Sequence, residues 1–336
     1  MIERPDFTRL LNLAQPRLGA EVMSASDDFF ADKSRLIKPE APVFVVGKYD
    51  DHGKWMDGWE SRRRRTPGHD HAILKLGQPG RIFGFEVDTT HFTGNFPPFC
   101  SIDAAHCAGL PVENDWVELV GKSPLKGNQK HYYSVTCEDI FTHIRLNIYP
   151  DGGVARLRVY GEIAIDWSRF DRSEEIDLAA LEMGGRVVLA SDAHFGVPEN
   201  LIAPGKGVNM GDGWETRRRP DRGTDPDYWT DAHDFCILAL GHKGVLHRAV
   251  IETTHFKGNY PDRMSLQAID ATVSPPPGGG VPGSEDWPEI LPQSKLGPDD
   301  AFSFDLSCPT PVTHVRLNIY PDGGVSRLRL YGRITD

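Results

Sequence analysis

A nonapeptide that occurs twice constrains the fold of this chain more than any other feature. The sequence Thr-Thr-His-Phe-x-Gly-Asn-[Phe/Tyr]-Pro begins at Thr89 and again at Thr253, 164 positions later (253 − 89). A histidine, a glycine and an asparagine keep the same spacing in both copies. Such a recurrence indicates that the chain contains an internal repeat of domain size.

Two further blocks recur in the same order, one before and one after the nonapeptide. Asp-Gly-Trp-Glu-[Ser/Thr]-Arg-Arg-Arg begins at Asp57 and Asp212, and Thr-His-[Ile/Val]-Arg-Leu-Asn-Ile-Tyr-Pro-Asp-Gly-Gly begins at Thr142 and Thr313. The offset between copies grows from 155 (212 − 57) through 164 to 171 (313 − 142). Insertions therefore fall between the blocks, where loops accept them.

The repeat divides the 336 residues into two homologous domains. This length suits two domains better than one core. We expect the first domain over residues 15–165 and the second over residues 184–336. The linker 166–183 is expected to contain a short helix ended by Gly184 and Gly185.

The local pattern within each copy is that of strands. Ile144, Leu146 and Ile148 alternate with polar residues, which is the period of a half-buried strand. The Tyr-Pro-Asp-Gly-Gly turn and the alternation around Leu157 then predict a β-hairpin. With 34 Gly, 26 Pro and few helical stretches, the sequence predicts an all-β chain. Each domain is expected to be an antiparallel β-sandwich of jelly-roll type.

Composition excludes several classes of partner. The formal charge is −11, from 37 basic and 48 acidic residues, which argues against a nucleic-acid or anionic-membrane surface. Five cysteines without a Cys-x-x-Cys pair argue against disulfides and structural zinc. No secretory signal or apolar run of membrane-spanning length is visible. We therefore expect a cytoplasmic protein whose partners are small molecules.

The nonapeptide is the first candidate site. A carboxylate stands three residues before each histidine, where it could orient the imidazole for acid–base catalysis near neutral pH. The candidate catalytic residues are therefore one histidine and one carboxylate from each copy: His91 with Asp88, and His255 with Glu252. The alternative interpretation is a loop in which these groups only satisfy backbone atoms.

The arginine-rich block is the second candidate site. Guanidinium groups bind carboxylates bidentately and could form an anion pocket in this acidic protein. Residues two apart share one face of a strand, so the candidates pair as Arg62 with Arg64 and Arg217 with Arg219. The alternative is a solvated charge run anchored by buried tryptophans.

Other polar groups carry weaker signals. His143 and Arg145 on the late strand are interpreted as structural, and His69-Asp70 as slightly more structural than functional. His-Glu-x-x-His and Cys/His metal spacings are absent from the sequence. We predict no metal and no cofactor, although the abundance of His and Asp leaves a divalent metal open.

Taken together, the three duplicated motifs resemble those of the allantoicase (allantoate amidinohydrolase) family, over nearly the whole chain from about Leu18. The resemblance implies two galactose-binding-like jelly rolls, a homo-oligomer and conversion of allantoate and water to ureidoglycolate and urea in allantoin degradation. Two other classes stay open: a non-catalytic ligand-binding jelly-roll protein, and a metal-dependent hydrolase of a related ureido or guanidino acid.

The chemistry of allantoate assigns an expected role to each candidate. Its carboxylate needs an anchor, which suits the four arginines, and its ureido groups need amide partners, which suits Asn95 and Asn259. Proton transfer to the leaving nitrogen suits His91 or His255. Whether both copies hold a site, one copy holds it, or the site lies between them is left open by the sequence.

Overall fold

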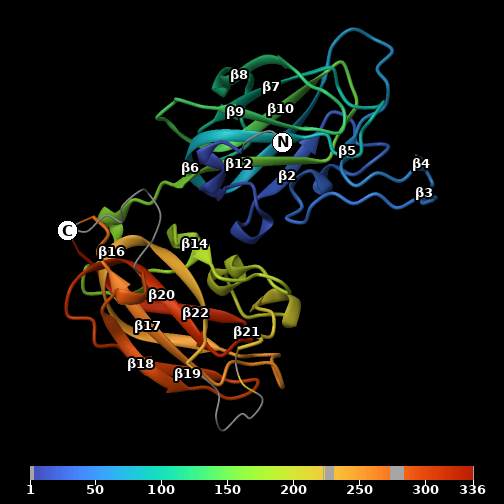
Figure 1. Ribbon diagram of the computed structural model, residues 1–336. Helices are drawn as coiled ribbons and strands as arrows, with labels where there is room; N and C mark the ends of the chain where they lie inside the picture. Colours follow the sequence, from blue (N-terminus) through green and yellow to red (C-terminus); the bar gives the residue numbers. More distant parts are fainter. Residues whose placement is uncertain (1–3, 222, 224–230, 273–283, 336) are drawn as a thin grey trace. The chain divides into compact units, whose positions relative to one another are not determined.

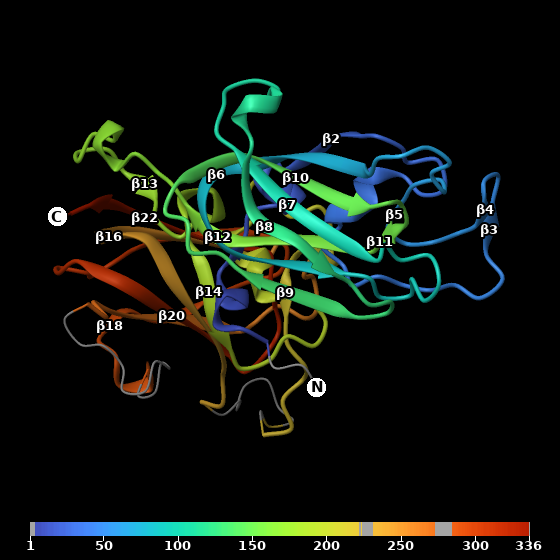
Figure 2. The same ribbon diagram turned by 90° about the horizontal axis from the view of Figure 1, so that it is seen from above.

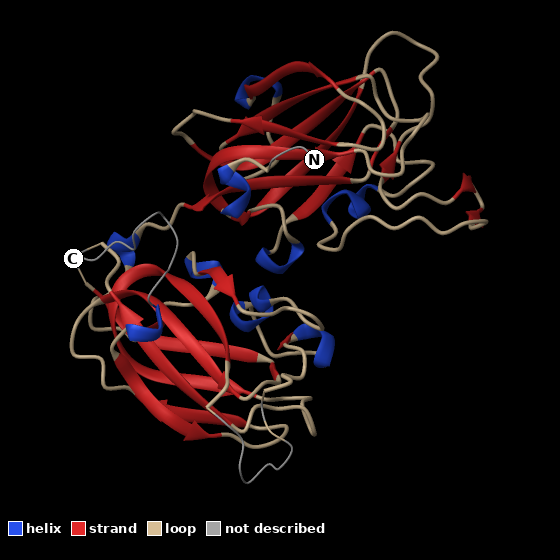
Figure 3. Cartoon of the chain, viewed as in Figure 1, coloured by secondary structure: helices blue, strands red, loops and turns tan. Residues whose placement is uncertain are grey.

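The computed structural model describes residues 4–221, 223, 231–272 and 284–335. Contacts divide the chain into two compact units, Met1–Ala164 and Ile165–Asp336. Strands are the main regular elements of each unit, and its described helices are short 3-10 turns (Figure 3). The expected all-β fold with two sandwiches is therefore confirmed. In the described residues no helix is long and apolar enough to cross a membrane.

The main hydrogen-bonded set of strands in the first unit, called repeat 1 below, has eight strands, and two pairs of short strands lie outside it. Its order is β1 (Leu11–Asn12), β12 (Arg156–Ile163), β6 (Asp70–Asp88), β10 (Ile140–Tyr149), β7 (Phe99–Ala105) and β8 (Val117–Pro124). β2 (Glu21–Ala25) and β9 (Lys130–Ser134) also pair with β6, while β5 (Trp59–Glu60) pairs with β11 (Gly153–Val154). A small hairpin joins β3 (Tyr49–Asp50) to β4 (Gly53–Lys54).

The second unit, repeat 2, has the same strand order (Figure 1). It runs β13 (Ile176–Asp177), β22 (Arg327–Ile334), β16 (Asp234–Glu252), β20 (Val312–Tyr320), β17 (Arg263–Ile269) and β18 (Glu289–Lys295). β14 (Arg186–Ala190) and β19 (Ala301–Asp305) pair with β16, and β15 (Trp214–Glu215) pairs with β21 (Gly324–Val325). The duplication seen in the sequence is thus a duplication of the fold.

Short 3-10 helices fill the connections. They are η1 (Asp6–Arg9), η2 (Pro16–Leu18), η3 (Lys33–Ile37), η4 (Glu113–Asp115), η5 (Trp167–Arg169), η6 (Leu181–Met183), η7 (Pro198–Ile202), η8 (Met210–Asp212) and η11 (Ser284–Asp286). The segment 166–183, expected to be a linker, begins the second unit. Its helical part is only η6, which ends at Gly184 in the left-handed region (φ 83°).

One long strand in each repeat carries the chain from one sheet of the sandwich to the other. The first half of β6 pairs with β10 and its second half pairs with β12. The predicted hairpin between β10 and β12 is therefore wrong, because these strands pair with different halves of β6. The intervening turn, with a cis Tyr149-Pro150 bond, instead sends the chain across the end of the sandwich.

Phe92 of the nonapeptide is fully buried against a glycine of that turn. A β-carbon added at Gly153 would lie 2.0 Å from Phe92 Cε1, and the matching atoms of Gly324 and Phe256 show the same distance. The bare backbone of each glycine therefore lets the nonapeptide loop pack onto the turn.

We expect Gly153→Ala to lower the free energy of unfolding by about 1–3 kcal/mol, because the added methyl overpacks the Phe92 ring. Gly94→Ala is the matched control, since a β-carbon there meets no atom within 4 Å. Its effect should stay within about 0.5 kcal/mol. Chemical denaturation of both variants tests this, and equal losses would contradict the packing argument.

The two repeats differ most in the loop before the Trp-Glu block. In repeat 1 this loop carries the β3–β4 hairpin, which extends away from the sheets (Figures 1 and 2). In repeat 2 the shorter equivalent has η8 in place of this hairpin, while η7 matches η3 of repeat 1. Apolar side chains of the repeat 1 loop are exposed, among them Val46 at 87% and Tyr49 at 71%.

Candidate active site

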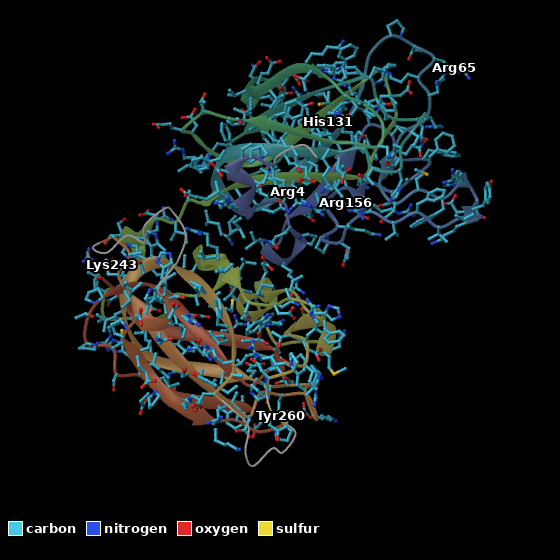
Figure 4. The ribbon with its side chains drawn as sticks, in the orientation of Figure 1. Arg4, Arg65, His131, Arg156, Lys243 and Tyr260 are labelled. Carbon is cyan, nitrogen blue, oxygen red and sulfur yellow. The ribbon has the colours of Figure 1, made fainter. Side chains whose placement is uncertain are left out.

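The three duplicated motifs meet at one end of each sandwich. In repeat 1 the amide of Gly153 donates to the carbonyl of Asn95 (2.7 Å), and the amide of Ser61 donates to the carbonyl of Gly152 (3.1 Å). Repeat 2 has the same two bonds, at 2.8 and 3.1 Å. Figure 4 labels Tyr260, which marks the nonapeptide loop at this end of repeat 2. Blocks far apart in sequence thus form one surface.

A carboxylate–amide pair joins the Trp-Glu block to the nonapeptide in both repeats. Asn95 Nδ2 donates to Glu60 Oε1 at 2.7 Å, and Asn259 Nδ2 donates to Glu215 Oε1 at 2.5 Å. The sequence predicts both asparagines as site residues but neither glutamate. Each glutamate lies inside a duplicated block, and this recurrence is the signal that could have identified it.

Burial makes the Glu60 carboxyl a weaker acid than a free glutamate. Burial raises the pKa of Glu60 above its usual value of 4.5, while the hydrogen bond from Asn95 and the charge of Lys54 act in the opposite direction. Lys54 belongs to the β3–β4 hairpin that repeat 2 lacks. A carboxyl group that retains its proton above its usual range suits general acid catalysis.

This raised pKa predicts a pH-dependent stability. The folded state holds the Glu60 proton more tightly than the unfolded chain, so the stabilisation is present below pH 4.5 and is lost as pH rises through the raised pKa. Glu60→Gln removes this titration. Relative to wild type, the variant should therefore gain unfolding free energy between about pH 4 and pH 7. Urea denaturation at both pH values tests this, and a constant difference would contradict it.

His91 and His255 occupy matching and unusual positions. Both have left-handed backbones, with φ of 70° and 73°, a conformation that costs free energy for residues other than glycine. His91 Nε2 lies 3.1 Å from the carbonyl of Pro42, and His255 Nε2 lies 2.9 Å from that of Gly207. Each ring therefore holds the loop before its Trp-Glu block, and its Nδ1 is the nitrogen left for a ligand.

The two candidate carboxylates do not hydrogen-bond to these rings within the described residues. Asp88 accepts a hydrogen bond from the amide of Thr90 (2.8 Å) and lies 3.7 Å from Lys130 Nζ. Glu252 lines a separate hollow of about 520 Å³ together with Asp177 and Arg329. The expected carboxylate–histidine dyads are therefore not formed, because the left-handed turn at each histidine carries its ring toward the preceding loop.

Arg62 and Arg217 are anchored but exposed. Arg62 pairs with Asp27 (2.6 Å) and Arg217 with Asp192 (3.1 Å), and their side chains are 62% and 66% exposed. The aspartates accept hydrogen bonds from the same arginines' backbone amides. Each guanidinium is thus fixed in direction while much of it faces solvent.

Arg64 and Arg219 are held more deeply. Arg64 Nη1 donates to Asp70 Oδ1 at 2.7 Å, and Ser26 Oγ donates to the same oxygen at 2.9 Å. Arg219 and Ser191 bind Asp234 in the same way. These arginines position the start of the long strands β6 and β16, and Asp70 of the His69-Asp70 pair is part of that support.

A buried arginine on the strand after the turn was not anticipated from sequence. Arg156, labelled in Figure 4, is 1% exposed and pairs with Asp57 at 2.7 Å. It also donates to the carbonyl oxygens of Asp57 and Glu40. Arg327 repeats this arrangement with Asp212. Each arginine binds the same loop as the histidine of its repeat, two residues before the carbonyl that the histidine contacts.

Fold and site together define a tandem β-sandwich protein with a carboxylate–amide pair at one end of each sandwich. The profile described as "Allantoicase repeat" matches residues 11–164 and 176–335. The chain is 53% identical to a probable allantoicase 1 of Burkholderia mallei, over 98% of this chain and 96% of the relative. It is 51% identical to a probable allantoicase of Ralstonia nicotianae, over 98% and 97% of the two chains.

A solved structure agrees with these relatives. The crystal structure of allantoicase from Saccharomyces cerevisiae is 35% identical, with a TM-score of 0.78 over 96% of this chain and 92% of that one. The chain belongs to the allantoicase family.

Proposed function

We propose that this protein hydrolyses allantoate to ureidoglycolate and urea at the end of the sandwich where the duplicated motifs meet. The family consists of hydrolases that act on C–N bonds in linear amidines, and at about half identity over nearly its whole length this chain is an enzyme of that class. The observation that carries the proposed site is the contact of Glu60 with Asn95, repeated as Glu215 with Asn259.

In the proposed reaction one glutamate first donates a proton and then accepts one. Allantoate carries a carboxylate, a hydrogen and two ureido groups on one carbon. Protonated Glu60 donates its proton to the ureido nitrogen whose bond to that carbon breaks, and this group leaves as urea. The resulting carboxylate accepts a proton from water, whose oxygen bonds to the carbon and becomes the hydroxyl of ureidoglycolate.

Neighbouring groups position the substrate in this proposal. Asn95 holds Glu60 through Nδ2 and has an amide oxygen suited to ureido N–H groups. The Nδ1 atom of His91 supplies a further polar contact. The exposed guanidinium of Arg62 anchors the substrate carboxylate. Asn259, His255 and Arg217 take these roles in repeat 2. Arg64 and Arg219 support the site through their contacts with Asp70 and Asp234.

The experiment that tests this function is a urea-release assay on purified protein. Allantoate should be turned over, while ureidoglycolate, allantoin and guanidinoacetate should not. Folded protein without turnover of allantoate would overturn the proposal. Treatment with a chelator decides the mechanism class, because loss of activity that divalent ions restore would replace this acid–base scheme with a metal-dependent one.

We further propose that the protein is a cytoplasmic homo-oligomer. Its five cysteines are free thiols, which suits a reducing compartment. Exposed apolar side chains such as Val46 suit an interface between subunits. Size-exclusion chromatography with light scattering measures the mass of the assembly. A monomer at micromolar concentration would contradict this part of the proposal.

A further inference from the structure

A second polar hollow lies on the sheet of repeat 1, formed by residues other than the Glu60–Asn95 pair. Its volume is about 310 Å³, which is enough for a small molecule. Asn147 of β10 and Ser101 and Asp103 of β7 line it from the sheet, all less than 10% exposed. His71 and Tyr149 also line it. From the sequence, the polar side chains of β10 are expected to be structural.

One buried atom in this hollow lacks a hydrogen-bonding partner. Asn147 is 3% exposed, and its Nδ2 donates to Ser101 Oγ (3.1 Å) and Asp103 Oδ2 (2.8 Å). Its Oδ1 is buried and accepts no hydrogen bond from any residue that the structure describes. A buried acceptor without a donor costs free energy, which a ligand N–H group would recover.

Repeat 2 shows the same position with that atom satisfied from within the chain. Asn318 stands opposite Ser265 on the neighbouring strand, as Asn147 stands opposite Ser101. Its Oδ1 accepts a hydrogen bond from Arg316 Nε at 2.7 Å. Arg316 also lies 3.2 Å from His233 Nε2 and 4.1 Å from the ring centre of Phe235. In repeat 2 the arginine therefore supplies the N–H donor that a ligand could supply to Asn147 in repeat 1.

The corresponding arginine of repeat 1, Arg145, donates to carboxylates and not to Asn147. Arg145 pairs with Asp103 (2.9 Å) and Glu113 (2.9 Å) and lies over Trp116 at 4.7 Å. Two substitutions accompany this change: Asp103 stands where repeat 2 has Gln267, and His71 stands where it has Phe235. Both replace an uncharged or apolar group with a stronger polar one, so the repeat 1 hollow is polar and open.

The charges around the hollow select the kind of ligand. Asp103, Glu113 and Glu118 outnumber the single guanidinium of Arg145. Burial, with the charges of Arg145 and His69, lowers the pKa of His71, so its ring is neutral at neutral pH. Carboxylates, an amide oxygen and a neutral imidazole bind N–H donors and repel anions.

We propose that this hollow of repeat 1 is a binding site for a small, planar, N–H-rich ligand of the urea and guanidinium class. The Asn147 amide oxygen receives one N–H group, and the carboxylates at the rim receive the others. The proposal goes beyond the hydrolytic site, since it concerns other residues and assigns the two repeats different roles. It predicts one such site per chain.

The test is a direct binding titration of the full chain with guanidinium chloride and with urea, each at millimolar concentration, by ligand-observed NMR or calorimetry. Wild type should bind guanidinium at one site per chain, and acetate should not compete. His71→Phe with Asp103→Gln gives repeat 1 the residues of repeat 2, which that repeat shows to be compatible with the fold. This double variant should weaken binding at least tenfold.

Single substitutions of exposed carboxylates provide the matched pair. Glu118→Gln should weaken guanidinium binding measurably, whereas Glu289→Gln, the equivalent change in repeat 2, should leave it unchanged. No binding to wild type, equal binding to the double variant, or equal effects of the two glutamine variants would each overturn the proposal.

The allantoate assay on the same variants keeps the two sites apart. Loss of turnover in Glu60→Gln with guanidinium binding intact supports a separate second site. Loss of guanidinium binding in Glu60→Gln would overturn it, because the probe would then occupy the hydrolytic site.

Discussion

Replacing Glu60 with glutamine should lower kcat for allantoate about 10²- to 10⁴-fold, which is the usual contribution of a positioned acid–base group. The glutamine oxygen can still accept the hydrogen bond from Asn95 Nδ2, so the loop geometry should persist. Only the transferable proton is lost. Urea release at saturating allantoate measures kcat, and circular dichroism checks the fold.

The matched variant Glu215→Gln shows which repeat performs the reaction. Because burial raises the pKa of Glu60, we expect the larger loss from Glu60→Gln. Arg62→Ala should chiefly raise KM, because the arginine binds the carboxylate in both ground and transition states. Full activity of the double variant Glu60→Gln/Glu215→Gln would remove both glutamates from the mechanism.

Replacing Asp57 with alanine should lower the free energy of unfolding by about 3–5 kcal/mol, because it leaves the buried charge of Arg156 without its counter-ion. Arg156 is 1% exposed and also fixes the loop through the carbonyl of Glu40. The loop that carries Pro42 should therefore loosen and activity should fall as well. Urea denaturation measures the stability change.

Lys38→Ala is the control for this ion pair. Lys38 also contacts Asp57 (3.1 Å), but its side chain is 42% exposed, so its loss should cost less than about 1 kcal/mol. Equal effects of Asp57→Ala and Lys38→Ala would show that burial of the arginine does not determine the stability. A cost below 1 kcal/mol for Asp57→Ala would contradict the account directly.

The fold was largely readable from the sequence because the repeat supplied an internal comparison. Alternation at Ile144, Leu146 and Ile148 correctly predicts a strand, and all three are fully buried. The connection after this strand could not be derived, since a turn sequence does not specify which strands pair. That pairing depends on β6, whose 19 residues span both halves of the sandwich.

The sequence indicates which blocks form the site but not which of their side chains contact one another. Duplication identified the Trp-Glu block, the nonapeptide and the turn as separate blocks, and the structure brings them together. Duplication did not reveal that Glu60 rather than Asp88 contacts the amide of the nonapeptide, because spacing in sequence does not give side-chain direction at a left-handed turn. Arg145 and Arg316 have different partners because the residues opposite them on the neighbouring strands differ. Which residues stand opposite is known only from the strand register.

The most direct test of the proposed site is a crystal structure with ureidoacetate, which keeps the carboxylate and one ureido group of allantoate but lacks the group that leaves. We predict that its ureido group contacts Glu60 and Asn95, or Glu215 and Asn259, and that its carboxylate meets Arg62 or Arg217. Ureidoacetate bound only elsewhere, with both glutamate–asparagine pairs untouched, would contradict the proposal that allantoate is cleaved at this end of the sandwich.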